Sequence, residues 1–434
     1  MKKLLTVLIA ITLAANAYTQ DYLISFEGSG DITTVDSTII NNLTQGTSLI
    51  VYGNDQLLLV ENITGVNSIW DNEDNILSIY PNPSTEYSIV EFSVPRAGII
   101  TTELYDISGK RVLQNSKQLE KGSHSLQISG LGSGFYNINI RSTEFSYSGK
   151  IVSQSNTKGL AQINYTGQTY IPVNETLLKN KNAEVQMQYS AGDRLKYTAY
   201  SANYSTVVID IPAESKSISF NFVECTDKDE NNYSIVEIGA QIWMAENLKT
   251  NKFPGGNEIT LVESNTAWAA LTQNDIAYSF YDNSSSYANT YGAFYTWGAV
   301  MNGAASSDDN PSGVQGVCPN GWHVPSDAEW TELVDYLGGE STAGGKMKDV
   351  GTILWDSPNT GATNESGFSA LPGGYRNTSG DCITIEETAD FWSATMDGTG
   401  FSWFRYLRKG NINVERSTYN RPAGLSVRCV KDQE

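Results

Sequence analysis

The chain has 434 residues, of which only 18% are charged, whereas 38 are glycine and 24 are tyrosine. This composition favours short strands joined by tight turns, and the length exceeds what one hydrophobic core serves, so we expect a mainly β protein of roughly three domains. The formal net charge of −20 repels phosphate backbones and anionic lipid surfaces, which argues against nucleic acid as a partner.

The amino-terminal residues have the pattern of a signal peptide. Two lysines precede an apolar run from Leu4 to Ala15, and small residues flank a cleavage site that we place before Tyr18. A membrane span needs about 20 apolar residues, which is more than this run contains, and no later stretch is long enough. We therefore expect residues 1–17 to be removed and the mature chain to be exported without insertion into a membrane.

Three β-rich segments follow the signal peptide. Residues 18–76 alternate short apolar bursts with turn residues, which predicts a small β-rich unit. Across residues 77–153 the alternation is regular, and about seven short strands fit an immunoglobulin-like sandwich. Residues 157–224 continue the pattern, and we expect them to form a further β-rich module.

Five motifs occur in order within residues 77–153, namely Tyr80-Pro81-Asn82-Pro83, Val94-Pro95-x-Ala97-Gly98, Leu104-Tyr105-Asp106-Ile107-Ser108-Gly109-Lys110, Leu131-x-x-Gly134-x-Tyr136 and Lys150-Ile151-Val152. Through these motifs the segment resembles the C-terminal sorting domain of the Bacteroidetes type IX (Por) secretion system. The resemblance implies that the type IX machinery is a partner and that the protein reaches the outer face of the envelope. In that family the module ends the protein and is removed, whereas here more than half of the chain follows it. The sequence therefore leaves two hypotheses open for this segment, a sorting signal and a structural sandwich that stays in the mature protein.

The C-terminal half carries one strong helix signal. Ser326 can cap the helix, and Glu329 stands three residues later, which is the spacing of a capping box. Apolar residues then recur on one face until Gly338-Gly339 ends the pattern, namely Trp330, Leu333, Val334 and Leu337. A shorter helix is expected over residues 267–271.

Six ordered motifs occur within residues 225–431, namely Ile238-Gly239-x-Gln241-x-Trp243-Met244-Ala245-Glu246-Asn247-Leu248-Lys249, Tyr291-Gly292-x-x-Tyr295-x-Trp297, Cys318-Pro319-x-Gly321-Trp322-His323-Val324-Pro325, Asn364-Glu365-Ser366-Gly367-Phe368-Ser369-Ala370-Leu371-Pro372-Gly373-Gly374-Tyr375-Arg376, Phe391-Trp392-Ser393-Ala394-Thr395 and Gly424-x-Ser426-Val427-Arg428-Cys429-Val430. Through them the segment resembles the Fibrobacter succinogenes major paralogous domain family. The resemblance implies a compact α+β domain, similar to the C-type lectin-like fold and to formylglycine-generating enzymes, with no reaction attached to it.

The four cysteines are Cys225, Cys318, Cys382 and Cys429. An even number in an exported chain favours disulfides, and the sequence leaves their connectivity open. The resemblance to the lectin-like fold implies a bond between Cys318 and Cys429, with Cys225 and Cys382 either paired to each other or free.

Residues for catalysis or metal binding are sparse. The two histidines, His124 and His323, lie far apart in the sequence, so neither a catalytic triad nor a zinc site with closely spaced ligands is evident. We expect no enzyme activity and no cofactor; the calcium loops of lectins are not reproduced, and calcium is the one cation that the resemblance leaves open. The alternative is an oxidase or modifying enzyme that uses Cys382 or Cys429, as the formylglycine-generating relatives do.

The candidate ligand contacts are aromatic residues near the carboxy terminus, namely Trp392, Trp403, Tyr406 and Tyr419. Aromatic side chains offer a large apolar area with a polar edge, although in a small domain they also fill the core. We expect a non-catalytic secreted or cell-surface protein whose domain at residues 225–434 binds a glycan, a peptide or an envelope protein. A purely structural envelope protein is the third hypothesis.

Overall fold

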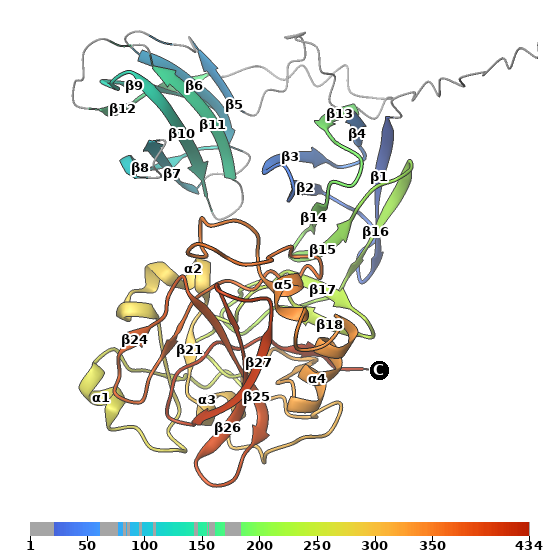
Figure 1. Ribbon diagram of the computed structural model, residues 1–434, viewed down its shortest axis with the longest axis vertical. Coiled ribbons are helices and arrows are strands. Elements are labelled where there is room, and N and C mark those ends of the chain that lie inside the picture. The colour runs from blue at the N-terminus through green and yellow to red at the C-terminus, as the bar shows by residue number, and fades with distance from the viewer. Residues whose placement is uncertain are drawn as a thin grey trace, which may run out of the picture. The chain divides into compact units, whose positions relative to one another are not determined.

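The computed structural model describes residues 21–60, 77–80, 84, 87–94, 98–106, 110–142, 146–153, 155, 161–169 and 184–433. The signal peptide and parts of the sorting-domain motifs, residues 81–83, 95–97 and 107–109, lie outside these residues. The chain divides into two compact units, one formed by residues 1–63 and 182–434 and the other by residues 64–181. The prediction of a mainly β, multi-domain fold is confirmed (Figure 1).

The first unit begins with a β-sandwich, here called the first sandwich. One of its sheets has the order β13-β4-β1-β16, with strands β1 (Tyr22–Gly30), β4 (Gln56–Val60), β13 (Glu184–Gln188) and β16 (Lys216–Phe222). Facing it are β2 (Ser37–Asn42), β3 (Thr47–Tyr52), β14 (Leu195–Ser201) and β15 (Tyr204–Asp210). The two sheets share one core, which includes Ile24, Ile40, Leu57, Tyr197 and Phe220.

The first sandwich combines two segments that the sequence pattern predicts as separate units. Both of its sheets contain strands from residues 18–76 and strands from residues 157–224. Alternating apolar residues show which face of a strand is buried, but they carry no information about which distant strand lies beside it. The separation into two modules therefore does not describe how these strands pack.

The second unit has two four-stranded sheets, with the orders β11-β10-β7-β8 and β12-β9-β6-β5. Its strands are β5 (Leu77–Tyr80), β6 (Tyr87–Val94), β7 (Gly98–Asp106), β8 (Arg111–Leu119), β9 (Gly122–Ser129), β10 (Gly134–Arg141), β11 (Ser146–Ser153) and β12 (Gln162–Thr169). The last of them pairs with β9, so residues 162–169 complete this unit and are not part of the following module. His124 is buried here, with its Nδ1 2.8 Å from the Tyr165 hydroxyl and its Nε2 2.6 Å from the Glu120 carbonyl.

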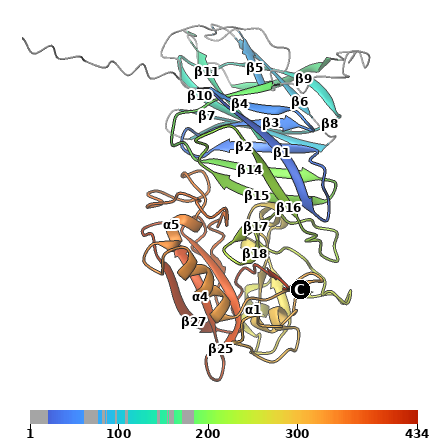
Figure 2. The same ribbon diagram turned by 90° about the vertical axis from the view of Figure 1, so that its right-hand side faces the viewer.

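The sheet of the first sandwich that contains β15 continues into the C-terminal segment, residues 225–433. Strand β17 (Ile235–Ile238) pairs in parallel with β15 (Figure 2). The strand order β22-β28-β18-β17-β15-β14-β2-β3 runs through both parts. The added strands are β18 (Gln241–Met244), β22 (Trp322–His323) and β28 (Val430–Lys431). The C-terminal segment and the first sandwich therefore share a continuous sheet.

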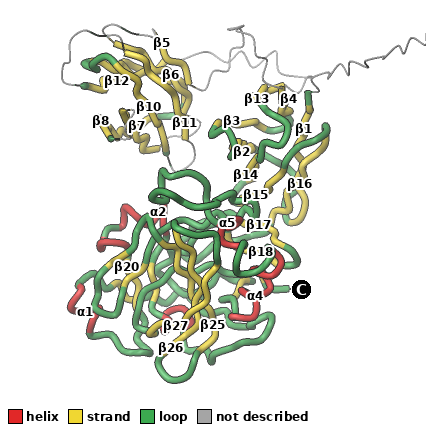
Figure 3. The backbone as a smooth tube through the Cα atoms, viewed as in Figure 1, coloured by secondary structure: helices red, strands yellow, loops and turns green. Residues whose placement is uncertain are grey.

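Short helices and strands make up the rest of the C-terminal segment (Figure 3). The helices are α1 (Asn265–Ala269), α2 (Ala288–Tyr291), α3 (Trp297–Met301), α4 (Asp327–Tyr336) and α5 (Ala343–Met347), with 3-10 turns at Tyr281–Asn283 and Ser285–Tyr287. The strands are β19 (Thr260–Leu261), β20 (Ala277–Ser279), β21 (Phe294–Tyr295), β23 (Tyr375–Arg376), β24 (Cys382–Ile383), β25 (Thr388–Met396), β26 (Phe401–Arg408) and β27 (Val414–Asn420). Within the described residues, the helices fall short of the length and apolar character that crossing a bilayer requires.

The longest of these helices, α4, begins where the capping box predicts. The Ser326 hydroxyl accepts from the Glu329 amide at 3.1 Å, and the Glu329 carboxylate accepts from the Ser326 amide at 2.9 Å. The predicted apolar face, which includes Trp330 and Leu333, is buried against β25 and its neighbours. The shorter predicted helix, over residues 267–271, is observed as α1 at Asn265–Ala269.

Candidate functional site

The sheet β25–β26–β27 presents two faces, because successive side chains of a strand point to opposite sides. Tyr406 and Tyr419 lie on one face with Phe404, whereas Trp403 lies on the other. Trp392 is fully buried, and its indole N–H donates to the Tyr295 carbonyl at 2.9 Å. Trp392 thus belongs to the core, which corrects its assignment as a candidate ligand contact.

Three half-buried tyrosines and one phenylalanine form what we call the tyrosine face: Tyr375, Phe404, Tyr406 and Tyr419. The Phe404 and Tyr406 rings stack with centroids 5.2 Å apart. Tyr419 meets Tyr375 edge-on at 5.3 Å and Phe404 at 6.0 Å. These contacts fix the rings in place, so a ligand would meet an ordered aromatic surface.

Charged groups flank the tyrosine face. The Tyr406 hydroxyl donates to the Glu415 carboxylate and accepts from Arg408 at 3.2 Å, and the Arg408 guanidinium lies 4.9 Å from the Tyr406 ring centroid. Asn411 donates to the same carboxylate at 3.0 Å. The face therefore combines aromatic rings with a guanidinium and a carboxylate, groups that donate and accept hydrogen bonds respectively.

The hydroxyls of Tyr375 and Tyr406 are neutral near pH 7, because the pKa of each is raised. Burial and the hydrogen bond to Tyr419 raise the pKa of Tyr375, and burial with the Glu415 contact raises the pKa of Tyr406. Burial alone would raise the pKa of Glu415, but Tyr406, Asn411 and Arg408 outweigh it and lower that pKa. A neutral hydroxyl network beside an ionised carboxylate suits polar, uncharged ligand groups.

A buried carboxylic acid, that of Asp390, lies on the same side of the sheet as Tyr406. Asp390 pairs across the strands with Tyr406, and its carboxylate accepts from the Thr388 hydroxyl at 2.5 Å, which in turn contacts the Thr384 hydroxyl at 2.7 Å. Burial raises the pKa of Asp390 to about 7, and Thr388 and Arg408 only partly oppose that rise. Asp390 is therefore the group here whose charge changes near neutral pH.

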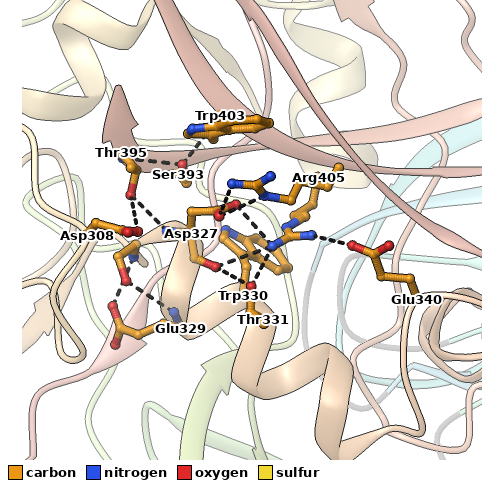
Figure 4. Close-up of polar contacts among 12 residues, drawn as sticks. Asp308, Asp327, Glu329, Trp330, Thr331, Glu340, Ser393, Thr395, Trp403 and Arg405 are labelled. Atoms are coloured by element: carbon orange, nitrogen blue, oxygen red, sulfur yellow. Dashed lines mark hydrogen bonds and ion pairs between the residues drawn. The ribbon is translucent and has the colours of Figure 1, made fainter. Parts of the chain in front are cut away.

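The opposite face of the sheet, here called the arginine face, carries a network of ion pairs and hydrogen bonds (Figure 4). Asp327, at the first turn of α4, contacts Arg405 at 3.0 Å and Arg416 at 2.8 Å. Arg416 also lies 3.4 Å from the Trp403 ring centroid. Arg405 is buried and further bonds Thr331 at 2.8 Å and Glu340 at 3.2 Å. Trp403 is held by this network and shares no face with Tyr406.

The cysteines divide into one bonded pair and two free thiols. Cys318 and Cys429 form a disulfide, which is the pair that the family resemblance implies. Cys225 and Cys382 are free, which decides between the two alternatives, a second bridge or two free thiols, that the sequence leaves open. Cys225 is buried in the core near Tyr233, whereas Cys382 lies on β24 with its sulfur 4.0 Å from the Phe280 carbonyl. Burial raises the pKa of both thiols.

His323 is bonded on both ring nitrogens. Its Nε2 lies 2.6 Å from Glu329 and its Nδ1 lies 2.7 Å from Asp432, and the side chain is buried. The same Glu329 carboxylate closes the capping box and accepts from the Ser312 amide at 3.0 Å. His323 therefore joins strand β22, helix α4 and the chain end, as expected for a packed residue.

Three buried cations were not predicted from the sequence. Arg428 is fully buried and donates to Asn247 and to backbone carbonyls including that of Ser369, at 2.8 and 3.1 Å. Arg376 bonds five acceptors and lies 4.6 Å from the Trp268 ring centroid. The Lys348 ammonium donates to the carbonyls of Thr360, Arg408 and Asn411. The available signal was strongest for Arg428, which stands between Val427 and Cys429 inside a family motif, whereas Lys348 lies outside the motifs.

No cluster of three or more His, Cys, Asp or Glu side chains among the described residues could hold a metal ion. A pocket of about 650 Å³ lies elsewhere, lined by residues of β15, β17 and α4 that include Ile209, Glu237 and Tyr336. None of the four candidate ligand contacts lines it.

Two family models match the chain. Residues 236–431 match the Fibrobacter succinogenes major domain, and residues 78–154 match the secretion system C-terminal sorting domain. The resemblances drawn from the sequence are thereby confirmed. No curated protein and no solved structure matches the chain. The sorting-domain match indicates an exported protein, secreted or held at the cell surface, that engages the type IX machinery.

Proposed function

We propose that the protein is a non-catalytic secreted or cell-surface protein that binds a glycan on the tyrosine face of its C-terminal segment. The observation that carries this proposal is the array of three half-buried tyrosines beside Arg408 and Glu415. A sugar ring has apolar C–H faces that pack on aromatic rings, and hydroxyls that both donate and accept hydrogen bonds.

The state of the thiols and histidines supports a non-catalytic role. A nucleophilic cysteine needs a lowered pKa, whereas burial raises the pKa of Cys382, and Cys429 is held in a disulfide. Both ring nitrogens of His124 and of His323 are engaged by neighbouring groups. These residues serve packing, which leaves the aromatic surface as the best candidate for function.

The proposal is tested by applying the full mature chain to a glycan array, with envelope proteins and peptides arrayed in parallel. We expect binding to a defined set of glycans and competition by the same glycan in solution. Binding only to proteins or peptides, or no binding at all, contradicts the proposal. Thiol-dependent turnover of any arrayed peptide would favour the enzyme hypothesis instead.

A further inference from the structure

The amino-terminal strands are built into a sheet with strands that follow the second unit. Residues Ile24–Gly30 of β1 pair in parallel with Lys216–Phe222 of β16, although nearly two hundred positions separate them in the chain. The Asp31 amide extends this pairing by donating to the Phe222 carbonyl at 2.9 Å. Strand β1 therefore adds an edge-to-edge pairing to β16 in the way that a separate peptide strand adds to a sheet.

Two further pairings join the same halves of the chain. Strand β2 pairs antiparallel with β14 from Ser37 to Asn42, and β4 pairs in parallel with β13 from Gln56 to Val60. Polar side chains reinforce the join, because the Asn42 amide donates to Asp193 at 2.9 Å. The amino-terminal segment, residues 21–60, is thus held in both sheets of the first sandwich.

The paired strands also share one hydrophobic core. Ile24, Ile40 and Leu57 of the amino-terminal segment are fully buried. They pack in one cluster with residues from beyond the second unit, which include Tyr197 and Phe220. Neither half can fill this core alone, so each depends on the other for its apolar partners.

The segment that links the two halves contributes none of its described strands to the first sandwich. Strands β4 and β13 are parallel neighbours, so the chain must cross from the end of one to the start of the other. The crossover is residues 61–183, and all of its described strands pair within the sheets of the second unit. Cutting it breaks none of the hydrogen bonds that join the two halves.

We propose that residues 21–60 are a built-in strand donor that stays docked when the crossover is cut, so that hydrolysis by an endopeptidase leaves a two-chain protein. Each cut consumes one water molecule and converts a peptide bond into a carboxylate and an amine. The C-terminal segment is retained together with its amino-terminal strands. Loss of the sorting-like module therefore does not detach the rest of the protein, and this holds whatever ligand the tyrosine face binds.

The test uses the full mature chain with a site for a sequence-specific protease inserted between Ile63 and Thr64 and another between Lys181 and Asn182. Complete cutting is scored on a denaturing gel, and the products are then separated by gel filtration in native buffer. We expect the small fragment that carries β1 to co-elute with the fragment that begins at Asn182, and to separate from it only in denaturant. Elution of the small fragment alone in native buffer overturns the proposal.

Matched variants connect the result to the strand contacts. Ile24→Asn places an amide in the buried core, whereas Glu27→Asn changes an exposed position on the same strand. After cutting, we expect Ile24→Asn to release the small fragment and Glu27→Asn to retain it. Retention by both variants contradicts docking through the β1 core, and the cut wild-type chain gives a decisive result even where Ile24→Asn does not fold.

Discussion

The Nε2 atom of His323 lies 2.6 Å from Oε1 of Glu329, in a site where both side chains are buried. Burial, the largest single effect, lowers the pKa of His323, but the hydrogen bonds and charges of Glu329 and Asp432 together raise it above its usual value of 6.5. The folded protein therefore holds the proton more tightly than the unfolded chain does.

This relationship predicts a pH dependence of stability. The contribution of His323 is fully present below pH 6.5 and is lost as the pH rises through the raised pKa of the folded state. We expect His323→Gln to lower the free energy of unfolding by about 3 kcal/mol at pH 6 and by less at pH 9. Guanidinium unfolding of both proteins at each pH measures the difference. An effect of His323→Gln on the free energy of unfolding that is the same at both pH values contradicts a raised pKa for His323.

Asp390→Asn is expected to raise stability at neutral pH. Because burial raises the folded pKa of Asp390 from 3.8 to about 7, ionisation penalises the folded state increasingly between those two values. The variant keeps an acceptor for Thr388 and lacks the penalty, so its advantage over wild type should grow between pH 4 and pH 8 to on the order of 4 kcal/mol. Thermal unfolding of both proteins across this range tests the expectation. A stability advantage of Asp390→Asn that shrinks as the pH rises would contradict a raised pKa for Asp390.

Lys348→Met should destabilise the C-terminal segment by about 3 kcal/mol, because three backbone carbonyls lose their donor. Lys346→Met is the matched control, since its ammonium makes a partly exposed ion pair with Glu365 and should cost under about 1 kcal/mol. Burial lowers the pKa of Lys348 to about 8, so its contribution should rise with pH between about 8 and 10.5. Denaturant unfolding at pH 7 measures both variants. Equal losses of unfolding free energy in Lys348→Met and Lys346→Met would contradict a stabilising role for the buried Lys348 ammonium.

Titration of the denatured, unreduced protein should find two free thiols, those of Cys225 and Cys382. In the native state Cys225 should react only on unfolding, because it is fully buried and burial raises its pKa. The Cys318–Cys429 bond closes a sequence separation of 111 residues, and its loss through Cys318→Ser with Cys429→Ser should cost about 4 kcal/mol. Zero or four free thiols contradicts this pairing.

Local signals in the sequence predicted local structure well. Ser326 and Glu329 specify the start of α4 because a capping box depends only on residues three positions apart. The bond between Cys318 and Cys429 could not be derived in this way, and the family resemblance supplied it. The pairing of β1 with β16 escaped prediction because strand alternation does not identify a distant partner.

The candidate site was only partly predictable for the same reason. Trp403 and Tyr406 stand an odd number of positions apart, so strand alternation alone places them on opposite faces. The burial of Trp392 depends on the strands packed around β25, which no local pattern contains. Arginine is seldom buried, and only the bonds of Arg428 to distant carbonyls explain its place in the core.

The most direct test of the account is the affinity of a glycan identified on the array for three single variants of the full chain. Tyr406→Ala removes a ring from the tyrosine face, Trp403→Ala alters the arginine face, and Tyr336→Ala is a matched control at an exposed tyrosine of α4. Isothermal titration should show that Tyr406→Ala weakens binding roughly tenfold or more, while the other two variants bind as wild type does. Wild-type affinity in Tyr406→Ala, or a comparable loss in Trp403→Ala, would contradict the placement of the binding site on the tyrosine face.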